Sequence, residues 1–226
     1  MSARTIAIGD IHGCSAALAV LIEAIDLRPG DTLVTLGDYV HKGLDSQGAL
    51  DILIKLETRC ELISLIGNHD AVMLGAIDHL LSIEAWKALG GATTLQSYGD
   101  SGSLKNIPTS HAKFLRRCRL WHETPTHFFI HAAYDPERSL DQQDDATLLW
   151  QGIRDDVPGP HVSGKTAIVG HTSQKNGDIL DAGHLVCIDT NCWNGGWLTA
   201  IDVASRTIWQ ADERGWLRDG TSIHRR

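Results

Sequence analysis

No apolar stretch of this chain approaches the roughly 20 consecutive residues that a membrane-spanning helix needs. The segment before Asp10 has one early charge, Arg4, and then only a short apolar run, which is not the pattern of a secretory signal. The five cysteines are odd in number and include no C-x-x-C pair, so a disulfide framework is not indicated. We therefore expect a cytoplasmic protein with reduced cysteines and no membrane contact.

The chain also has fewer basic than acidic residues. The chain has 20 Lys and Arg against 28 Asp and Glu, which gives a formal net charge of -8. A surface that binds nucleic acid needs clustered basic residues, so we do not expect nucleic acid as a partner. An acidic protein can still bind phosphate where metal ions supply local positive charge. A phosphorylated protein or a small phosphoester therefore remains a possible partner.

Three common signatures of enzyme chemistry are missing as well. The sequence contains no G-x-S-x-G nucleophile elbow, no P-loop and no G-x-G-x-x-G dinucleotide fingerprint. It also has no internal repeat and no low-complexity linker, and 226 residues suffice for one domain with a substantial core. We expect a single domain over residues 1–226.

What the chain does contain is a regular alternation of short apolar runs with helical segments, which is typical of βαβ units and a mostly parallel sheet. Near the N-terminus the pattern predicts strands at 5–8, 32–36 and 60–66, and helices at 15–25 and 46–56. Further strands are expected at 127–131 and 166–169, followed by antiparallel hairpins between 179 and 209. Residues 71–123 have an irregular helical pattern, which predicts a helical insertion beside the site.

Polar turns rich in Asp, His and Asn follow the predicted strands. In α/β sheets, ligands gather at the carboxyl ends of the strands, so these turns are expected to form one site. The candidate ligands are Asp10, His12, Asp38, Asn68, His131 and His171. Carboxylate and imidazole ligands suit Mn, Fe, Zn or Ni. Two such ions about 3.5–4 Å apart can hold a hydroxide at neutral pH and stabilise in-line displacement at phosphorus.

Five motifs in order carry a family resemblance: Gly9-Asp10-Ile11-His12-Gly13, Gly37-Asp38-Tyr39-Val40-His41-Lys42-Gly43, Gly67-Asn68-His69-Asp70, His131, and Gly170-His171-Thr172. They resemble the phosphoprotein phosphatase family of metallophosphoesterases, which includes serine/threonine protein phosphatases and bacterial diadenosine tetraphosphatases. The resemblance implies an α/β fold, a calcineurin-like sandwich of mixed β-sheets flanked by helices. It further implies two divalent ions, with Mn and Fe expected.

The same resemblance implies roles for individual residues. The first metal would be held by Asp10, His12 and Asp38, and the second by Asp38, Asn68, His131 and His171, with Asp38 bridging. His69 would be the general acid that protonates the leaving-group oxygen, a role suited to imidazole near neutral pH.

The chain departs from the family in its middle motif, where protein phosphatases commonly carry Asp then Arg and this sequence has His41 then Lys42. The Asp would accept a hydrogen bond from the catalytic histidine; Asp70 or Asp45 could take its place here. Lys42 keeps a positive charge near the phosphate but loses the bidentate guanidinium fork. For the family's second phosphate-binding arginine, Arg154 is the candidate.

These features predict an enzyme that hydrolyses phosphomonoesters by attack of a hydroxide held between two metal ions. The favoured substrates are phosphoserine and phosphothreonine in proteins, with phosphotyrosine also considered. The alternative is a hydrolase of diadenosine tetraphosphate and other dinucleoside polyphosphates, which would use the same metals on a different leaving group. By resemblance, diadenosine tetraphosphatases also lack the Asp, so its loss does not imply an inactive enzyme. A third hypothesis is a non-catalytic phosphate-binding relative, which His41 and Lys42 motivate and the complete ligand set with His69 disfavours.

Overall fold

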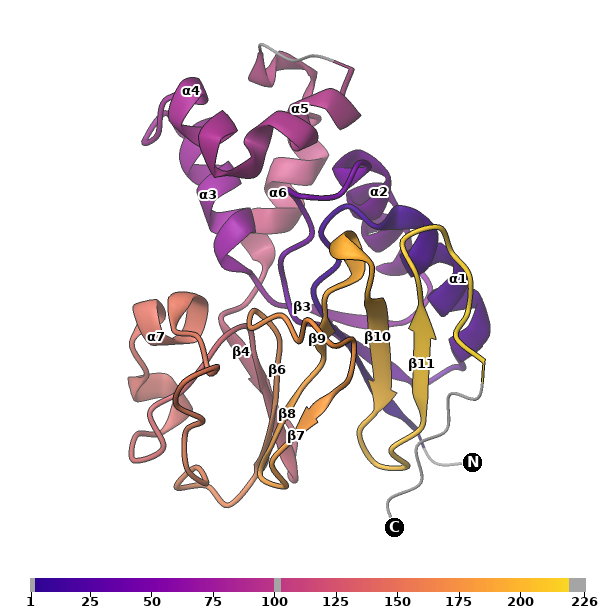
Figure 1. Ribbon diagram of the computed structural model, residues 1–226, viewed down its shortest axis with the longest axis vertical. Coiled ribbons are helices and arrows are strands. Elements are labelled where there is room, and N and C mark those ends of the chain that lie inside the picture. The colour runs from indigo at the N-terminus through magenta and orange to yellow at the C-terminus, as the bar shows by residue number, and fades with distance from the viewer. Residues whose placement is uncertain (1–2, 100–102, 220–226) are drawn as a thin grey trace.

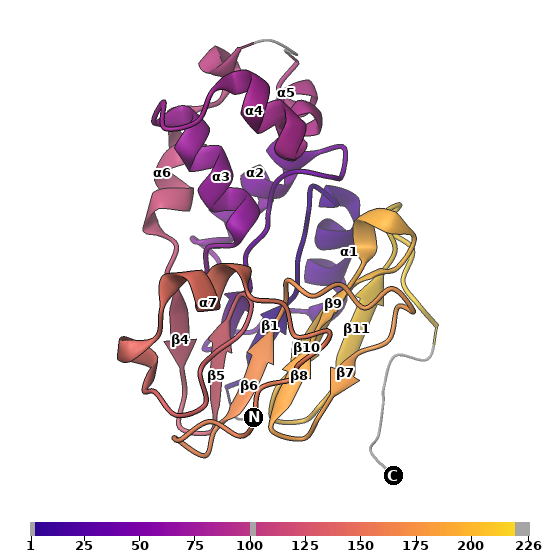
Figure 2. The same ribbon diagram turned by 60° about the vertical axis from the view of Figure 1, so that its left-hand side comes forward.

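The computed structural model describes residues 3–99 and 103–219 and contains two β-sheets that lie face to face (Figures 1 and 2). The first sheet has the order β11-β10-β1-β2-β3, with β9 paired to β10, and the second has the order β4-β5-β6-β8-β7. The first sheet consists of β1 (Thr5–Ile8), β2 (Thr32–Thr35), β3 (Glu61–Ser64), β9 (Asp189–Thr190), β10 (Trp197–Asp202) and β11 (Ile208–Ala211). The second consists of β4 (Trp121–Glu123), β5 (His127–Ile130), β6 (Thr166–Val169), β7 (Leu180–Asp181) and β8 (Leu185–Cys187).

Each sheet has a parallel core with antiparallel strands added at its sides. Strands β1, β2 and β3 are parallel, as are β5, β6 and β8. Strand β10 pairs antiparallel with both β1 and β11, and β4 and β7 pair antiparallel with their neighbours. The predicted sandwich of mixed sheets is confirmed, while the prediction of a mostly parallel sheet holds only for the two cores.

Apolar side chains of both sheets meet in the layer between them. Ala7, Val34 and Ile63 from the first sheet share one buried cluster with Phe129 and Ile168 from the second. The other face of the first sheet packs against α1 (Ser15–Ile25) and α2 (Ser46–Leu56), which coincide with the two predicted helices. The second sheet is covered by α7 (Asp145–Trp150). Strands buried on both faces explain why their sequences are short continuous apolar runs.

The helical insertion lies at one end of the sandwich, at the top of Figures 1 and 2. It contains α3 (Asn68–Ile77), α4 (Ile83–Trp86), the π-helical turn η1 (Lys87–Gly91), α5 (Ala92–Ser97), the 3-10 turn η2 (Leu104–Asn106) and α6 (Thr109–Arg117). Two further 3-10 turns, η3 (Leu140–Gln142) and η4 (Cys192–Asn194), lie in later loops. The helical insertion predicted around 71–123 is present, although α3 already begins at Asn68 and residues 121–123 pair with β5 as a strand.

Two further observations concern the cysteines and the lengths of the helices. All five cysteines are free thiols. None of the helices in the described part has the length and apolar character to cross a bilayer. The predicted single domain over 1–226 stays a prediction, and it includes residues 1–2, 100–102 and 220–226, which lie outside the described part of the chain.

A buried ion pair ties the starts of the first two parallel strands together. The Asp31 carboxylate, 2% exposed, accepts hydrogen bonds from the Arg4 backbone N–H at 3.0 Å, the Arg4 Nε–H at 3.0 Å and the Arg28 backbone N–H at 2.9 Å. Burial alone would raise the pKa of Asp31, but these donors and the Arg4 charge lower it to about 2. The pair therefore stabilises the alignment of β1 and β2, which carry two of the candidate metal ligands.

We predict that Asp31→Asn lowers the free energy of unfolding by about 1.5–3 kcal/mol at neutral pH, the usual contribution of hydrogen bonds to a charged group. Because the folded pKa lies below the ordinary value of 3.8, the stabilisation is complete above about pH 4 and is lost as the pH falls toward 2. Urea unfolding of wild type and variant from pH 7 downward measures the difference. A difference that stays constant down to pH 2.5 would contradict the assignment.

Candidate metal centre and active site

The candidate ligands lie at the carboxyl ends of the parallel strands from both sheets. Asp10 follows β1 and Asp38 follows β2, while Asn68 is the first residue of α3, just after β3. In the other sheet, His131 follows β5 and His171 follows β6. The two sheets meet at this edge, so the structure brings together residues that are as much as 161 positions apart.

The backbone at these turns adopts a conformation that costs free energy. His12, Asp38 and His171 have positive φ angles of 44°, 52° and 61°. Left-handed conformations of non-glycine residues cost on the order of 1–3 kcal/mol each and cluster at functional sites. Close packing holds Asp38 in place: a Cβ on Gly67 would lie only 2.1 Å from Asp38 Oδ1. Gly67 is therefore needed so that the α3 turn can approach the Asp38 carboxylate.

Three histidines present a lone pair to a common centre. In each, the outward ring nitrogen lies against a backbone carbonyl: His12 Nδ1 at 3.0 Å from Val40 O, His131 Nδ1 at 2.9 Å from Leu36 O, and His171 Nε2 at 3.2 Å from Trp150 O. A carbonyl only accepts, so the outward nitrogen carries the hydrogen and the inward nitrogen is left with its lone pair. This tautomer is the form of imidazole that binds a metal ion.

The Asp38 carboxylate lies between these histidines. Its Oδ2 is 3.4 Å from His12 Nε2 and its Oδ1 is 3.5 Å from His131 Nε2. On the second side, Asn68 Oδ1 is 3.0 Å from His131 Nε2 and 3.1 Å from His171 Nδ1. Lone pairs of carboxylate and imidazole that face each other at this distance repel unless a cation lies between them. The donor set therefore fits divalent metal ions, and Asp38 would be the ligand that two such ions share.

Asp10 completes the cluster on the first side. Its Oδ2 is 3.9 Å from His12 Nε2, and both carboxylate oxygens accept the His171 backbone N–H at 3.1 Å. The structure thus gathers all six predicted ligands at one place. Asp10 is also the point where the loops after β1 and β6 are joined.

The electrostatics of the cluster favour the same interpretation. Burial raises the pKa of Asp38 to about 7 and that of Asp10 well above its ordinary value, because a carboxylate loses its hydration there. Burial likewise lowers the pKa of His131 and His171 to about 4, so both rings are neutral at pH 7. Bound divalent cations would supply the positive charge that these buried carboxylates lack.

His69 also faces the centre, but its outward nitrogen has a different partner. Its Nε2 is 4.0 Å from Asp38 Oδ2, and its Nδ1 is 2.8 Å from His41 Nδ1. Asp70 and Asp45, the carboxylates considered for this place, are used elsewhere. Asp70 accepts backbone N–H groups at the turns after β2 and β3, and Asp45 caps the N-terminus of α2. The side chain that lies against His69 Nδ1 is therefore His41 and not a carboxylate.

Sequence reasoning missed Trp86. Its indole Nε1 donates to His41 Nε2 at 2.7 Å, and its side chain is fully buried in the helical insertion. The interaction joins residues 45 positions apart. No local motif around Trp86 signals it, because the contact exists only once the insertion has folded over the loop after β2.

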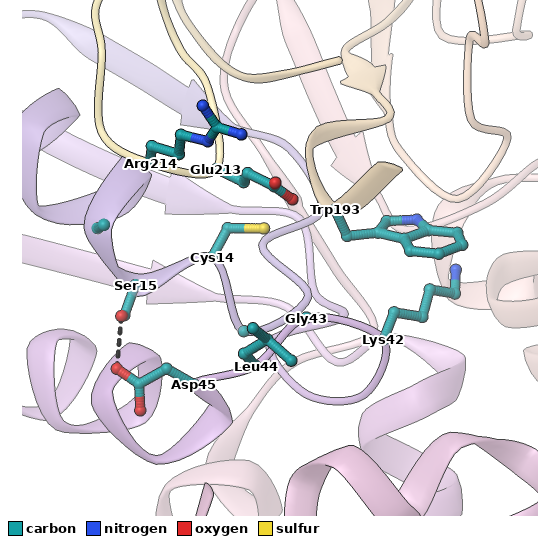
Figure 3. A pocket seen from close by; sticks show the side chains of 11 residues that line it. Cys14, Ser15, Lys42, Gly43, Leu44, Asp45, Trp193, Glu213 and Arg214 are labelled. Carbon is teal, nitrogen blue, oxygen red and sulfur yellow. Dashed lines mark hydrogen bonds between the residues drawn. The ribbon is translucent and has the colours of Figure 1, made fainter. Parts of the chain in front are cut away.

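Lys42 lies beside the cluster, and Arg154 lies on the loop that contacts Thr172. The Lys42 ammonium is 2.9 Å from His12 Nε2 and 5.3 Å from the centre of the Trp193 ring. Figure 3 shows these two side chains next to each other at the edge of a pocket of about 500 Å³. Arg154 is exposed on the loop whose Ile153 N–H donates to Thr172 Oγ1 at 3.0 Å, beside His171.

Residues 3–180 match the sequence profile described as calcineurin-like phosphoesterase. The chain belongs to the calcineurin-like phosphoesterase family. This agrees with the metallophosphoesterase resemblance drawn from the motifs, and the matched residues 3–180 include all six candidate ligands.

Among curated relatives, two bacterial proteins named symmetrical bis(5'-nucleosyl)-tetraphosphatase are similar to this chain. The one from Stutzerimonas stutzeri is 32% identical over 160 residues, which cover 64% of this chain and 54% of the relative. The one from Cellvibrio japonicus is 30% identical over 159 residues, 69% of this chain and 53% of the relative. The chain thus spans about half the length of the curated relatives it matches.

Solved structures share the fold. A structure titled as a candidate diadenosine tetraphosphatase superposes with a TM-score of 0.71 and 27% identity, covering 96% of this chain and 95% of the other. A cold-active protein tyrosine phosphatase superposes with a TM-score of 0.67 at 14% identity, covering 96% of this chain and 78% of the other. A serine/threonine phosphatase from Saccharomyces cerevisiae gives 0.61 at 15% identity, covering 89% and 73%. The last two show the fold alone.

We predict that metal binding stabilises the protein and that Asp38→Asn removes most of this effect. For a single site, Zn²⁺ at about 100 times its Kd raises the free energy of unfolding by about 2.7 kcal/mol. In the metal-free protein, the same substitution lowers the free energy of unfolding only slightly, because it removes a buried charge. Thermal unfolding and bound-metal analysis, with the exposed Asp178→Asn as matched control, measure both effects. Equal metal content in wild type and Asp38→Asn would contradict the shared-ligand role.

Proposed function

We propose that this chain is a metal-dependent hydrolase of dinucleoside polyphosphates, cleaving a phosphoanhydride bond. The observation that carries the proposal is the cluster around Asp38, in which three neutral imidazoles, two carboxylates and an amide oxygen face one centre. Bound divalent ions would supply Lewis acidity and lower the pKa of a coordinated water. Mn or Fe is expected from the family, and the ligand set also suits Zn or Ni.

The residues around the cluster have separate tasks in this proposal. Asp38 holds both halves of the centre together, with Asp10 and His12 on one side and Asn68, His131 and His171 on the other. Lys42 provides a mobile positive charge for the phosphate chain, because its ammonium lies at the cluster and its stem is flexible. Arg154 is exposed on the loop that contacts Thr172 and would contact outer phosphates.

The substrate class is supported by the relatives and by the space beside Lys42. Both curated relatives described above are named tetraphosphatases of dinucleosides. The pocket of about 500 Å³ next to Lys42 is large enough for a group beyond the reacting phosphate, and its walls include Trp193, Leu44 and Arg214 (Figure 3). An aromatic ring next to a cation suits a nucleoside with attached phosphates.

The other two hypotheses have less support. Likeness to protein phosphatases lies in the fold, at 14% and 15% identity, so the protein-phosphatase prediction stays a prediction. A purely phosphate-binding protein would not need His69, whose Nε2 faces the cluster. A cytoplasmic location likewise stays a prediction.

Purified metal-loaded protein is expected to hydrolyse diadenosine tetraphosphate with a kcat/KM at least about tenfold above that for phosphoserine peptides, a difference of about 1.4 kcal/mol in transition-state binding. Product chromatography with Mn²⁺ measures the anhydride reaction, and phosphate release measures the peptide reaction. Asp38→Asn is the inactive control. A preference for the phosphopeptides would overturn the proposed substrate class while leaving the metal centre intact.

A further inference from the structure

His41 is held by the helical insertion on several sides. The ring is fully buried, its backbone N–H donates to Thr94 Oγ1 at 3.0 Å, and its Nε2 accepts the Trp86 indole N–H at 2.7 Å. Gly90 adopts a φ of 111°, and a Cβ there would lie 3.1 Å from His41 Cβ. The insertion therefore packs directly against His41 and leaves the ring one orientation.

Trp86, His41 and His69 form a row of hydrogen-bonded rings, and the Trp86 indole N–H determines where the histidine hydrogens lie. An indole N–H can only donate, so His41 Nε2 must offer its lone pair to Trp86. The hydrogen of the neutral His41 ring then sits on Nδ1, which lies 2.8 Å from His69 Nδ1. His69 Nδ1 must accept that hydrogen bond. The hydrogen of His69 is consequently on Nε2, the nitrogen that faces Asp38.

This arrangement is the reverse of that in the three ligand histidines. His12, His131 and His171 each give their outward hydrogen to a carbonyl and present a lone pair inward. His69 accepts on the outside and presents a hydrogen inward. His69 Nε2 lies close enough to His12 and Asp38 to suggest a metal ligand. A nitrogen that carries a hydrogen cannot coordinate, so His69 is separated from the ligand set by its tautomer.

We infer that Trp86 is a positioning residue that, through His41, fixes His69 as a neutral Nε2–H donor aimed at the leaving group. A carboxylate in the place of His41 would accept the Nδ1 hydrogen of His69 and stabilise its protonated form, which can give a proton to a basic alkoxide. The neutral ring donates a hydrogen bond but keeps its proton. The enzyme is therefore suited to leaving groups that need no proton.

This inference rests on the proposed function for its reaction. In that reaction a water oxygen forms a bond to phosphorus, and the bond from phosphorus to the bridging oxygen breaks. The electron pair stays on the departing polyphosphate, which is stable as an anion, and the proton of the water passes to solvent. His69 Nε2–H stabilises the charge that develops on the bridging oxygen. Nucleoside polyphosphates and aryl phosphates with acidic phenols meet this requirement, and alkyl phosphates such as phosphoserine do not.

The tautomers can be read from nitrogen chemical shifts of the wild-type protein loaded with diamagnetic Zn²⁺. In ¹⁵N-labelled protein, His69 is expected to show a protonated Nε2 and an unprotonated Nδ1, and His41 a protonated Nδ1. Trp86→Phe, which removes the donor and keeps an aromatic ring, is expected to release His41 and mix the His69 tautomers. Wild-type His69 with a protonated Nδ1 would overturn the inference. This measurement needs no substrate, so it is independent of whether the proposed function is right.

The catalytic consequence is tested with a series of aryl phosphates of increasing phenol pKa, followed by an alkyl phosphate. For wild type, kcat is expected to fall steeply along the series. His41→Asp is expected to flatten the fall and to raise kcat for the alkyl phosphate relative to the most acidic aryl phosphate by about a hundredfold, the lower end of what general acid catalysis contributes. Trp86→Phe should change kcat in the same direction with little change in KM, whereas Trp121→Phe on β4 should behave as wild type. A shallow wild-type dependence, or a uniform loss in Trp86→Phe for every substrate, would overturn the inference.

Discussion

The structure depends above all on the burial of the Asp38 carboxylate at the edge where the two sheets meet. A buried carboxylate is costly unless positive charge or hydrogen bonds compensate it. Asp38 receives one backbone N–H, from His69 at 2.9 Å, and its two carboxylate oxygens face the lone pairs of His12 and His131 at 3.4 and 3.5 Å. The protein thus holds a negative charge in a place that only a cation can satisfy. The left-handed turns, Gly67 and the Arg4–Asp31 pair all serve to keep the strand ends in this arrangement.

A second feature of the site is that the group behind each histidine ring decides which ring nitrogen carries the hydrogen. Four histidines surround Asp38. The hydrogen-bond partner of the outward ring nitrogen decides whether the inward nitrogen offers a lone pair or a hydrogen. A backbone carbonyl behind His12, His131 or His171 makes the ring a ligand, and a histidine behind His69 makes it a donor. The loop after β2 supplies the carbonyls behind two of the ligands and also carries His41. The helical insertion supplies Trp86. The insertion therefore contacts the candidate site directly, through the hydrogen bond from Trp86 to His41.

Much of this could be predicted from sequence, because the relevant signals are local. The two N-terminal helices were placed at their observed limits by apolar periodicity between strands that are themselves short apolar runs. The six candidate ligands were found because each follows a predicted strand within a few residues. Parallel strands bring such turns to one edge whatever the details of the loops.

Other features depend on contacts that no local pattern contains. The insertion was predicted to continue to residue 123, because Trp121, His122 and Glu123 lack the alternation of a half-buried strand; they form β4 only by pairing with β5. For the partner of His69 the family resemblance favours a carboxylate, with Asp70 and Asp45 as the candidates. Both carboxylates instead accept hydrogen bonds from backbone N–H groups. The tautomer of His41 is set by Trp86, which lies in α4 of the insertion.

The most direct test of the central claim is anomalous X-ray diffraction from crystals of the protein grown with Mn²⁺. The account predicts two anomalous peaks about 3.5–4 Å apart, as in other two-metal phosphoesterase sites. They should flank the Asp38 carboxylate, with Asp10 and His12 beside one peak and Asn68, His131 and His171 beside the other. A single peak, with the Lys42 ammonium still against His12, would show that lysine takes the place of the first ion and would contradict the two-metal account.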